Sequence, residues 1–112
     1  MKPLTYIASP YSHPDWGVRY LRFQAASQFA AKLTREGRHV FSPIAHSHPV
    51  AVFGGIDGGF EFWREWCVNL LDRCDDVIVL QLDGWMESVG VAHEIAYATA
   101  KGLPIRYVEW EQ

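Results

Sequence analysis

The feature that most constrains the fold is the segment from residue 76 to residue 82, which reads Asp-Val-Ile-Val-Leu-Gln-Leu. It is almost continuously apolar and rich in β-branched side chains. A strand with one face in water would alternate apolar and polar residues, so this pattern is typical of a central parallel strand that helices cover on both faces. The rest of the chain must therefore supply helices for both faces of a sheet.

Shorter strand-like runs and amphipathic stretches alternate around this segment. Strands are predicted at residues 4–9, 39–42 and 105–108, and helices at residues 17–36, 60–74 and 88–101. We expect a long connection with Gly and Pro residues between positions 43 and 59. The alternation predicts an α/β fold: a small three-layer, flavodoxin- or Rossmann-like parallel sheet of about four strands, in the order 2-1-3-4, flanked by helices.

The length and charge of the chain narrow its class further. Its 112 residues suit one domain, spanning residues 1–112. A net charge of -3, with no block of like charges, argues against nucleic acid or an anionic membrane as partner. No apolar run approaches the roughly 18 residues that span a bilayer, and the start does not resemble a signal peptide. We therefore expect a cytoplasmic protein that binds a small polar molecule.

In a sheet of this order, ligands bind beyond the carboxyl ends of the strands, where the strand order reverses. The small polar cluster with Ser9 and Tyr11 follows the first strand, and its hydroxyls are candidate ligand contacts. Ser88 follows the third strand and is a good N-cap, so the helix that it opens presents free amides and partial positive charge to an anion. Gly90 permits close approach to that turn.

Glu94 lies about one turn further along this helix, at the border of the predicted apolar face. A carboxylate held there is partly dehydrated, as a nucleophilic or acid–base carboxylate requires. The alternative is that Ser88 is only a cap and Glu94 a solvated side chain near Lys101. Spacing alone does not decide between these interpretations.

Several motifs together resemble a known superfamily. They are YIASPYS at 6–12, HSHP at 46–49, CD at 74–75, GWxxSxGVxxE at 84–94 and AxxxGxP at 98–104. The chain resembles the nucleoside 2-deoxyribosyltransferase-like superfamily over nearly its whole length and, within it, most closely the bacterial family DUF1937. The S-x-G-x-x-x-E spacing is also shared with the 2'-deoxynucleoside 5'-monophosphate N-glycosidases.

The resemblance implies roles for individual residues. Glu94 matches the nucleophile that attacks the anomeric carbon of the sugar, and Tyr6 matches a tyrosine that orients it. Ser88 and Gly90 match positions that bind the phosphate or the 5' end, and Ser9 lies in a loop that closes around the substrate. The implied function is cleavage or base exchange at the N-glycosidic bond of a nucleoside or nucleotide through a covalent glycosyl-enzyme. No cofactor is expected.

The chain departs from the superfamily at a second carboxylate. Transferases carry an aspartate at the position that Cys67 occupies here. A thiol does not replace an ionised carboxylate at neutral pH, because its ordinary pKa is about 8.5 and burial raises it. Asp72, one helical turn nearer the strand, is a possible substitute. If neither serves, the chain is a nucleotide-binding module that retains the pocket without turnover.

The remaining motifs have weaker interpretations. His46 and His48 would point the same way in an extended segment, but no acidic or Cys ligand has a suitable spacing. We therefore predict hydrogen bonds within the loop or contacts to the substrate rather than a metal site. The glycine-rich residues 54–59 are interpreted as a lid. Cys67 and Cys74 are predicted to be reduced thiols.

Five aromatic residues near this lid are candidates for covering a base or packing at a subunit contact, namely Phe53, Phe60, Phe62, Trp63 and Trp66. The alternative is packing in the core, which is the expected role of Trp63. The superfamily resemblance implies a homodimer or higher homo-oligomer whose subunits complete the pocket. A purely structural or interaction role is a third hypothesis, and it predicts no ligand binding.

Overall fold

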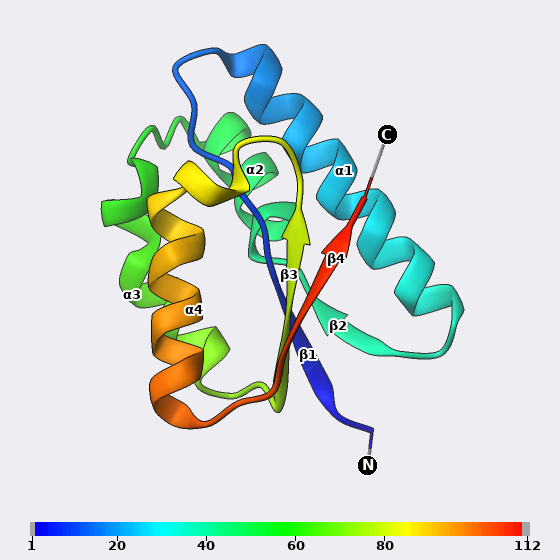
Figure 1. Ribbon diagram of the computed structural model, residues 1–112. Helices are drawn as coiled ribbons and strands as arrows, with labels where there is room; N and C mark the ends of the chain where they lie inside the picture. Colours follow the sequence, from blue (N-terminus) through cyan, green and yellow to red (C-terminus); the bar gives the residue numbers. More distant parts are fainter. Residues whose placement is uncertain (1, 111–112) are drawn as a thin grey trace.

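The computed structural model describes residues 2–110 and has three layers, with a parallel sheet between two layers of helices (Figure 1). The strands are β1 (Leu4–Ala8), β2 (His39–Phe41), β3 (Asp76–Gln81) and β4 (Ile105–Glu109). Their order is β2-β1-β3-β4, and all three neighbouring pairs are parallel. The predicted fold class and strand order are confirmed.

Helices cover both faces of the sheet. They are α1 (Trp16–Arg35), α2 (Pro43–Gly54), α3 (Gly59–Leu71) and α4 (Val89–Lys101), with a short 3-10 turn, η1 (Trp85–Glu87), before α4. Figure 1 shows α1 on one side of the strands and α3 with α4 on the other. Among residues 2–110, no helix has both the length and the apolar character needed to cross a bilayer.

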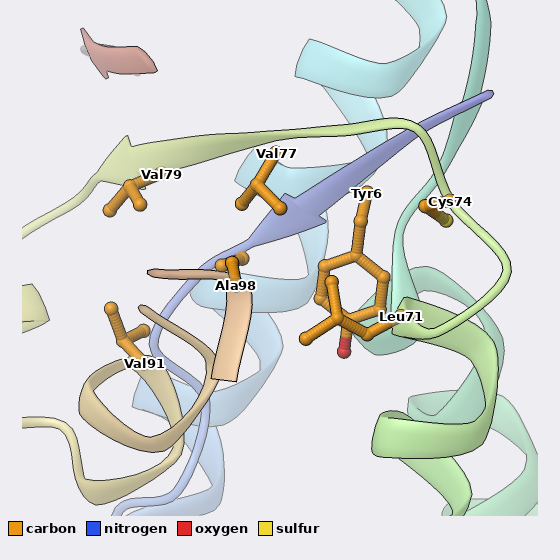
Figure 2. Close-up of a cluster of buried hydrophobic side chains, with 8 residues drawn as sticks. Tyr6, Leu71, Cys74, Val77, Val79, Val91 and Ala98 are labelled. Carbon is orange, nitrogen blue, oxygen red and sulfur yellow. The ribbon is translucent and has the colours of Figure 1, made fainter. Parts of the chain in front are cut away.

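The alternation of side chains along β1 and β3 divides the core into two parts. Ile7 and Ile78 face α1, where Phe29 packs against them. Tyr6 and Val77 face the opposite way, toward α3 and α4. Figure 2 shows this second cluster, in which the Tyr6 ring extends from β1 toward the two helices, with its hydroxyl at the far end. Tyr6 on β1, one of the two inner strands, therefore places its hydroxyl group in the layer of α3 and α4.

The prediction of a long connection between residues 43 and 59 is wrong over most of that range, because α2 occupies residues 43–54. The Ser42 hydroxyl accepts a hydrogen bond from the Ala45 amide at 3.2 Å, and Pro43 stands in the first turn, where a missing N–H costs nothing. Gly55 ends the helix in the left-handed conformation (φ +69°). The start and stop signals of a helix were therefore present in a segment whose Gly and Pro content suggested a loop.

The helix predicted for residues 60–74 also ends earlier than expected. The chain leaves α3 at Leu71 and turns into β3, so Cys74 lies beyond the helix. Cys67 and Cys74 are both buried free thiols, as predicted.

Candidate active site

A cavity of about 220 Å³ opens beyond the carboxyl ends of β1 and β3, at the position where the strand order reverses. Its wall combines the loop after β1, the first turns of α1 and α4, and faces of α2 and α3. The polar residues that line it are Ser9, Tyr11, Ser12, Arg19, Ser47, Asp57, Glu87, Ser88 and Glu94. At this volume the cavity lies just below the range of about 300–1,000 Å³ that is typical of small-molecule sites.

Glu94 is buried in the wall of this cavity, with 4% of its surface exposed. The hydroxyl of the fully buried Tyr6 donates a hydrogen bond to Oε2 of Glu94. Burial raises the pKa of Glu94 to about 8, and the bond from Tyr6 acts in the opposite direction because it stabilises the ionised form. The carboxyl group is therefore mostly protonated at neutral pH and is held in one orientation from β1.

Cys67 reaches the same group from α3. It lines the cavity, and its thiol interacts with the Tyr6 hydroxyl and with Glu94. Burial, followed by the negative charge of Glu94, raises the pKa of the Cys67 thiol to about 12. The thiol therefore stays neutral and supplies neither a negative charge nor an effective acid at neutral pH.

The first turn of α4 forms a second side of the cavity. The Ser88 hydroxyl accepts a hydrogen bond from the Val91 amide at 3.2 Å, which caps the helix. The preceding amides, of Val89 and Gly90, have no acceptor within the helix, and both residues line the cavity. A Cβ at Gly90 would stand 3.0 Å from the ring of Phe60, so glycine allows this aromatic ring to approach the turn.

Arg19 is a cavity residue that the sequence analysis missed. Its guanidinium lies 4.1 Å from the ring centroid of Trp16, its Nε donates to the carbonyl of His13, and its Nη1 is 3.3 Å from Oδ1 of Asp57. In the sequence, Arg19 is one of several basic residues on an amphipathic helix. Its position in the sequence could have indicated a role in the site. The helix that follows β1 begins at the ligand-binding edge of the sheet, and Arg19 is in the first turn of that helix.

Two hydroxyl groups after β1 have different surroundings. Ser9 is 6% exposed, and its Oγ has no hydrogen-bond partner among the described residues although the residue lines the cavity. The Tyr11 hydroxyl is 2.6 Å from Nδ1 of His48. The Ser9 hydroxyl is therefore open to a hydrogen bond with a ligand, whereas the Tyr11 hydroxyl already has a partner on α2.

His46 and His48 do not converge as an extended segment would require, because they lie two residues apart on α2. His48 is buried and stacks on Phe23 at 4.3 Å, and burial lowers its pKa. His46 stacks on Trp66 at 5.0 Å. Neither histidine lines the cavity. Across residues 2–110, no group of three His, Cys, Asp or Glu side chains is arranged to hold a metal ion.

The structure does not bring Asp72 to the cavity, contrary to the substitution suggested by its place in the sequence. Asp72 is exposed at the end of α3, where its carboxylate accepts hydrogen bonds from Tyr97 and Lys101. These contacts, the Lys101 bond first, lower the pKa of Asp72 and tie it to α4. Besides Glu94, the carboxyl groups on the cavity wall belong to Asp57 and Glu87, both exposed.

The aromatic residues near the glycine-rich segment divide into two groups. Phe60 and Trp63 line the cavity. Phe53 and Phe62 point outward, with 90% and 59% of their surfaces exposed. Trp66 packs beside Trp63 and Phe41.

Comparison with known proteins adds a family assignment. A search of curated proteins finds no match for this chain. The family model described as a domain of unknown function, DUF1937, matches residues 3–111, which include every cavity residue named above. The chain therefore belongs to the DUF1937 family.

Proposed function

We propose that the chain cleaves or exchanges the N-glycosidic bond of a nucleoside or nucleotide, as a member of the nucleoside 2-deoxyribosyltransferase-like superfamily. The observation that carries the proposal is the buried carboxyl of Glu94, oriented by the Tyr6 hydroxyl at the wall of a small cavity. The match of both residues to the superfamily motifs supports the same roles.

In this mechanism Glu94 attacks C1' of the sugar as the base departs. Positive charge develops on the sugar in the transition state, and a carboxylate beneath C1' traps it as a covalent glycosyl-enzyme. Water then releases the sugar by hydrolysis, or a second base accepts it in exchange. Attack requires the ionised carboxylate, so a pKa of about 8 for Glu94 predicts turnover that rises with pH up to that value.

The other sides of the cavity suit the two ends of a nucleotide. The free amides at the start of α4 and the guanidinium of Arg19 are donors for a phosphate or other anion. The rings of Phe60 and Trp63 offer flat apolar surfaces against which a base stacks. Cys67, a neutral thiol, does not supply the proton for the departing base, which in this proposal takes it from solvent water.

A non-catalytic nucleotide-binding module is the second candidate, and two observations favour it. Cys67 is a neutral thiol at a position where the superfamily resemblance implies a carboxylate, and the pKa of Glu94 keeps most molecules protonated at neutral pH. Such a module would keep the anion and base contacts without forming a glycosyl-enzyme.

The two candidates are separated by incubating the protein at pH 8 with deoxynucleosides and their monophosphates, with and without a second free base. Chromatography of released or exchanged base is the readout, and Glu94→Gln is the control. We expect release that Glu94→Gln abolishes. Ligand binding by calorimetry in both proteins, with no base released by either, would replace the enzyme proposal with the binding module.

We further propose that two or more copies of the chain assemble. Val52 and Phe53 on α2 and Phe62 on α3 are exposed apolar side chains near the glycine-rich segment that borders the cavity. A neighbouring subunit seated there would cover these side chains and extend the wall of the site.

A further inference from the structure

Asp57 lies on the cavity wall beside Arg19, a basic side chain of the same wall. Its Oδ1 is 3.3 Å from Nη1 of Arg19, and the residue belongs to the short segment between α2 and α3. We propose that Asp57 determines the specificity of the site: its carboxylate competes with anionic ligands for the Arg19 guanidinium and leaves when one binds. This inference rests on the anionic-ligand part of the proposed function.

Arg19 is held independently of Asp57. Its guanidinium stacks on Trp16 at 4.1 Å, its Nε donates to the His13 carbonyl, and its side chain is 19% exposed. These contacts keep the guanidinium at the cavity wall whether it pairs with Asp57 or with an anionic ligand. A planar guanidinium binds best to an acceptor that offers two oxygens to its fork, which a phosphate provides.

Asp57, by contrast, is weakly held. Its side chain is 73% exposed, and ion pairs with such an exposed member are weak. The flanking residues Gly55 and Gly59 have positive φ values of +69° and +51°, a region that glycine enters without a Cβ penalty. The carboxylate can therefore leave Arg19 at small cost in free energy.

Unused donors on the same wall point to an anionic occupant. The Ser9 hydroxyl is buried without a partner among the described residues, and the amides of Val89 and Gly90 have no acceptor within α4. A buried hydroxyl without a partner is unfavourable unless a ligand or solvent satisfies it. Among the described residues that line the same cavity, Arg19 is the basic one.

The consequence is discrimination by charge. A neutral ligand leaves the Arg19–Asp57 pair intact, whereas an anionic ligand that binds the guanidinium through Nη1 displaces the carboxylate from it. The affinity for anions is therefore lower than Arg19 alone would give, and removal of the Asp57 charge should raise it.

The test is calorimetric titration of the full chain with inorganic phosphate at low ionic strength, for the parent, Asp57→Asn and Glu61→Gln. Glu61 is an exposed carboxylate on α3 that pairs with Arg64, so its replacement changes the net charge equally without touching Arg19. We expect Asp57→Asn to lower the Kd for phosphate by about two- to fivefold, the strength of an exposed ion pair. Glu61→Gln should leave the Kd unchanged.

An unchanged or raised Kd in Asp57→Asn, or no phosphate binding in any of the three proteins, would overturn the inference. The same holds if Asp57→Asn still tightens binding to the same extent when Arg19 is replaced by glutamine in a variant whose thermal unfolding shows that it is folded. Base release from neutral nucleosides is measured separately, so the inference can fail while the proposed chemistry stands.

Discussion

Replacing Glu94 with glutamine removes a buried carboxyl group whose pKa is raised from 4.5 to about 8 by burial. Between these two values the unfolded chain has released the proton while the folded chain still holds it. The parent protein therefore loses stability as pH rises from about 4.5 to 8, and the loss is complete once both states are ionised. Glutamine does not titrate, so the variant lacks this dependence.

The magnitude follows from the pKa difference. One pKa unit corresponds to about 1.4 kcal/mol, and integration between pH 5 and pH 7 gives a change of about 2.5 kcal/mol in the stability difference between Glu94→Gln and the parent. The free energy of unfolding of the variant, relative to that of the parent, should rise by this amount between pH 5 and pH 7. The other titrating groups are common to both proteins, so their contributions cancel.

The assay is urea unfolding followed by tryptophan fluorescence at pH 5, 6, 7 and 8. Glu36→Gln is the control: the pKa of the exposed Glu36 is lowered, chiefly by its hydrogen bond to Lys32, so its effect on stability is confined to more acidic pH. The difference between Glu36→Gln and the parent should stay constant above pH 5. A Glu94→Gln difference that is equally flat would show that the carboxyl is ionised at neutral pH and refute the account of its burial.

Three further predictions concern the surroundings of Glu94. Tyr6→Phe removes the hydrogen bond that stabilises the ionised form, so the pH profile of base release should move to higher pH, and an unmoved profile would contradict the contact. Ser88→Ala and Ser42→Ala should each lower the free energy of unfolding by about 1 kcal/mol in chemical denaturation, because each removes an N-cap hydrogen bond. Only Ser88→Ala should also weaken phosphate binding. Equal phosphate affinity in the two variants would argue against an anion site at α4. Phe53→Ser should shift sedimentation from dimer toward monomer, whereas a parent chain that is monomeric at micromolar concentration would contradict assembly.

The general architecture was predictable from the sequence because it depends on patterns that act locally. The continuous apolar run of β3 requires cover on both faces, and alternating strands and helices lead to a parallel sheet. The position of the cavity was predictable from the expected strand order, because ligand sites in such sheets lie where that order reverses.

The errors arose where tertiary contacts decide the outcome. Residues 43–54 were expected to be a loop because of their Pro and Gly content, and the local signals at Ser42, Pro43 and Gly55 were outweighed; in the fold, Ser47, His48 and Ala51 of this helix are buried. Arg19 and Asp57 are separated by 38 residues, and nothing in a single sequence indicates that they meet. Asp72 was proposed as a substitute because it lies one helical turn nearer the strand than Cys67, whereas Lys101 and Tyr97 hold it at the end of α3, away from the cavity.

The central claim is that Glu94 forms a covalent bond to the sugar. It is tested most directly by intact-mass measurement and peptide mapping after exposure to 2'-fluoro-arabinosyl nucleosides and their monophosphates, because the fluorine slows breakdown of the glycosyl-enzyme. The account predicts a mass gain of one fluorosugar, or its phosphate, located on Glu94 and absent from Glu94→Gln. A sugar adduct on another residue, or base release by the parent that persists in Glu94→Gln, would contradict it.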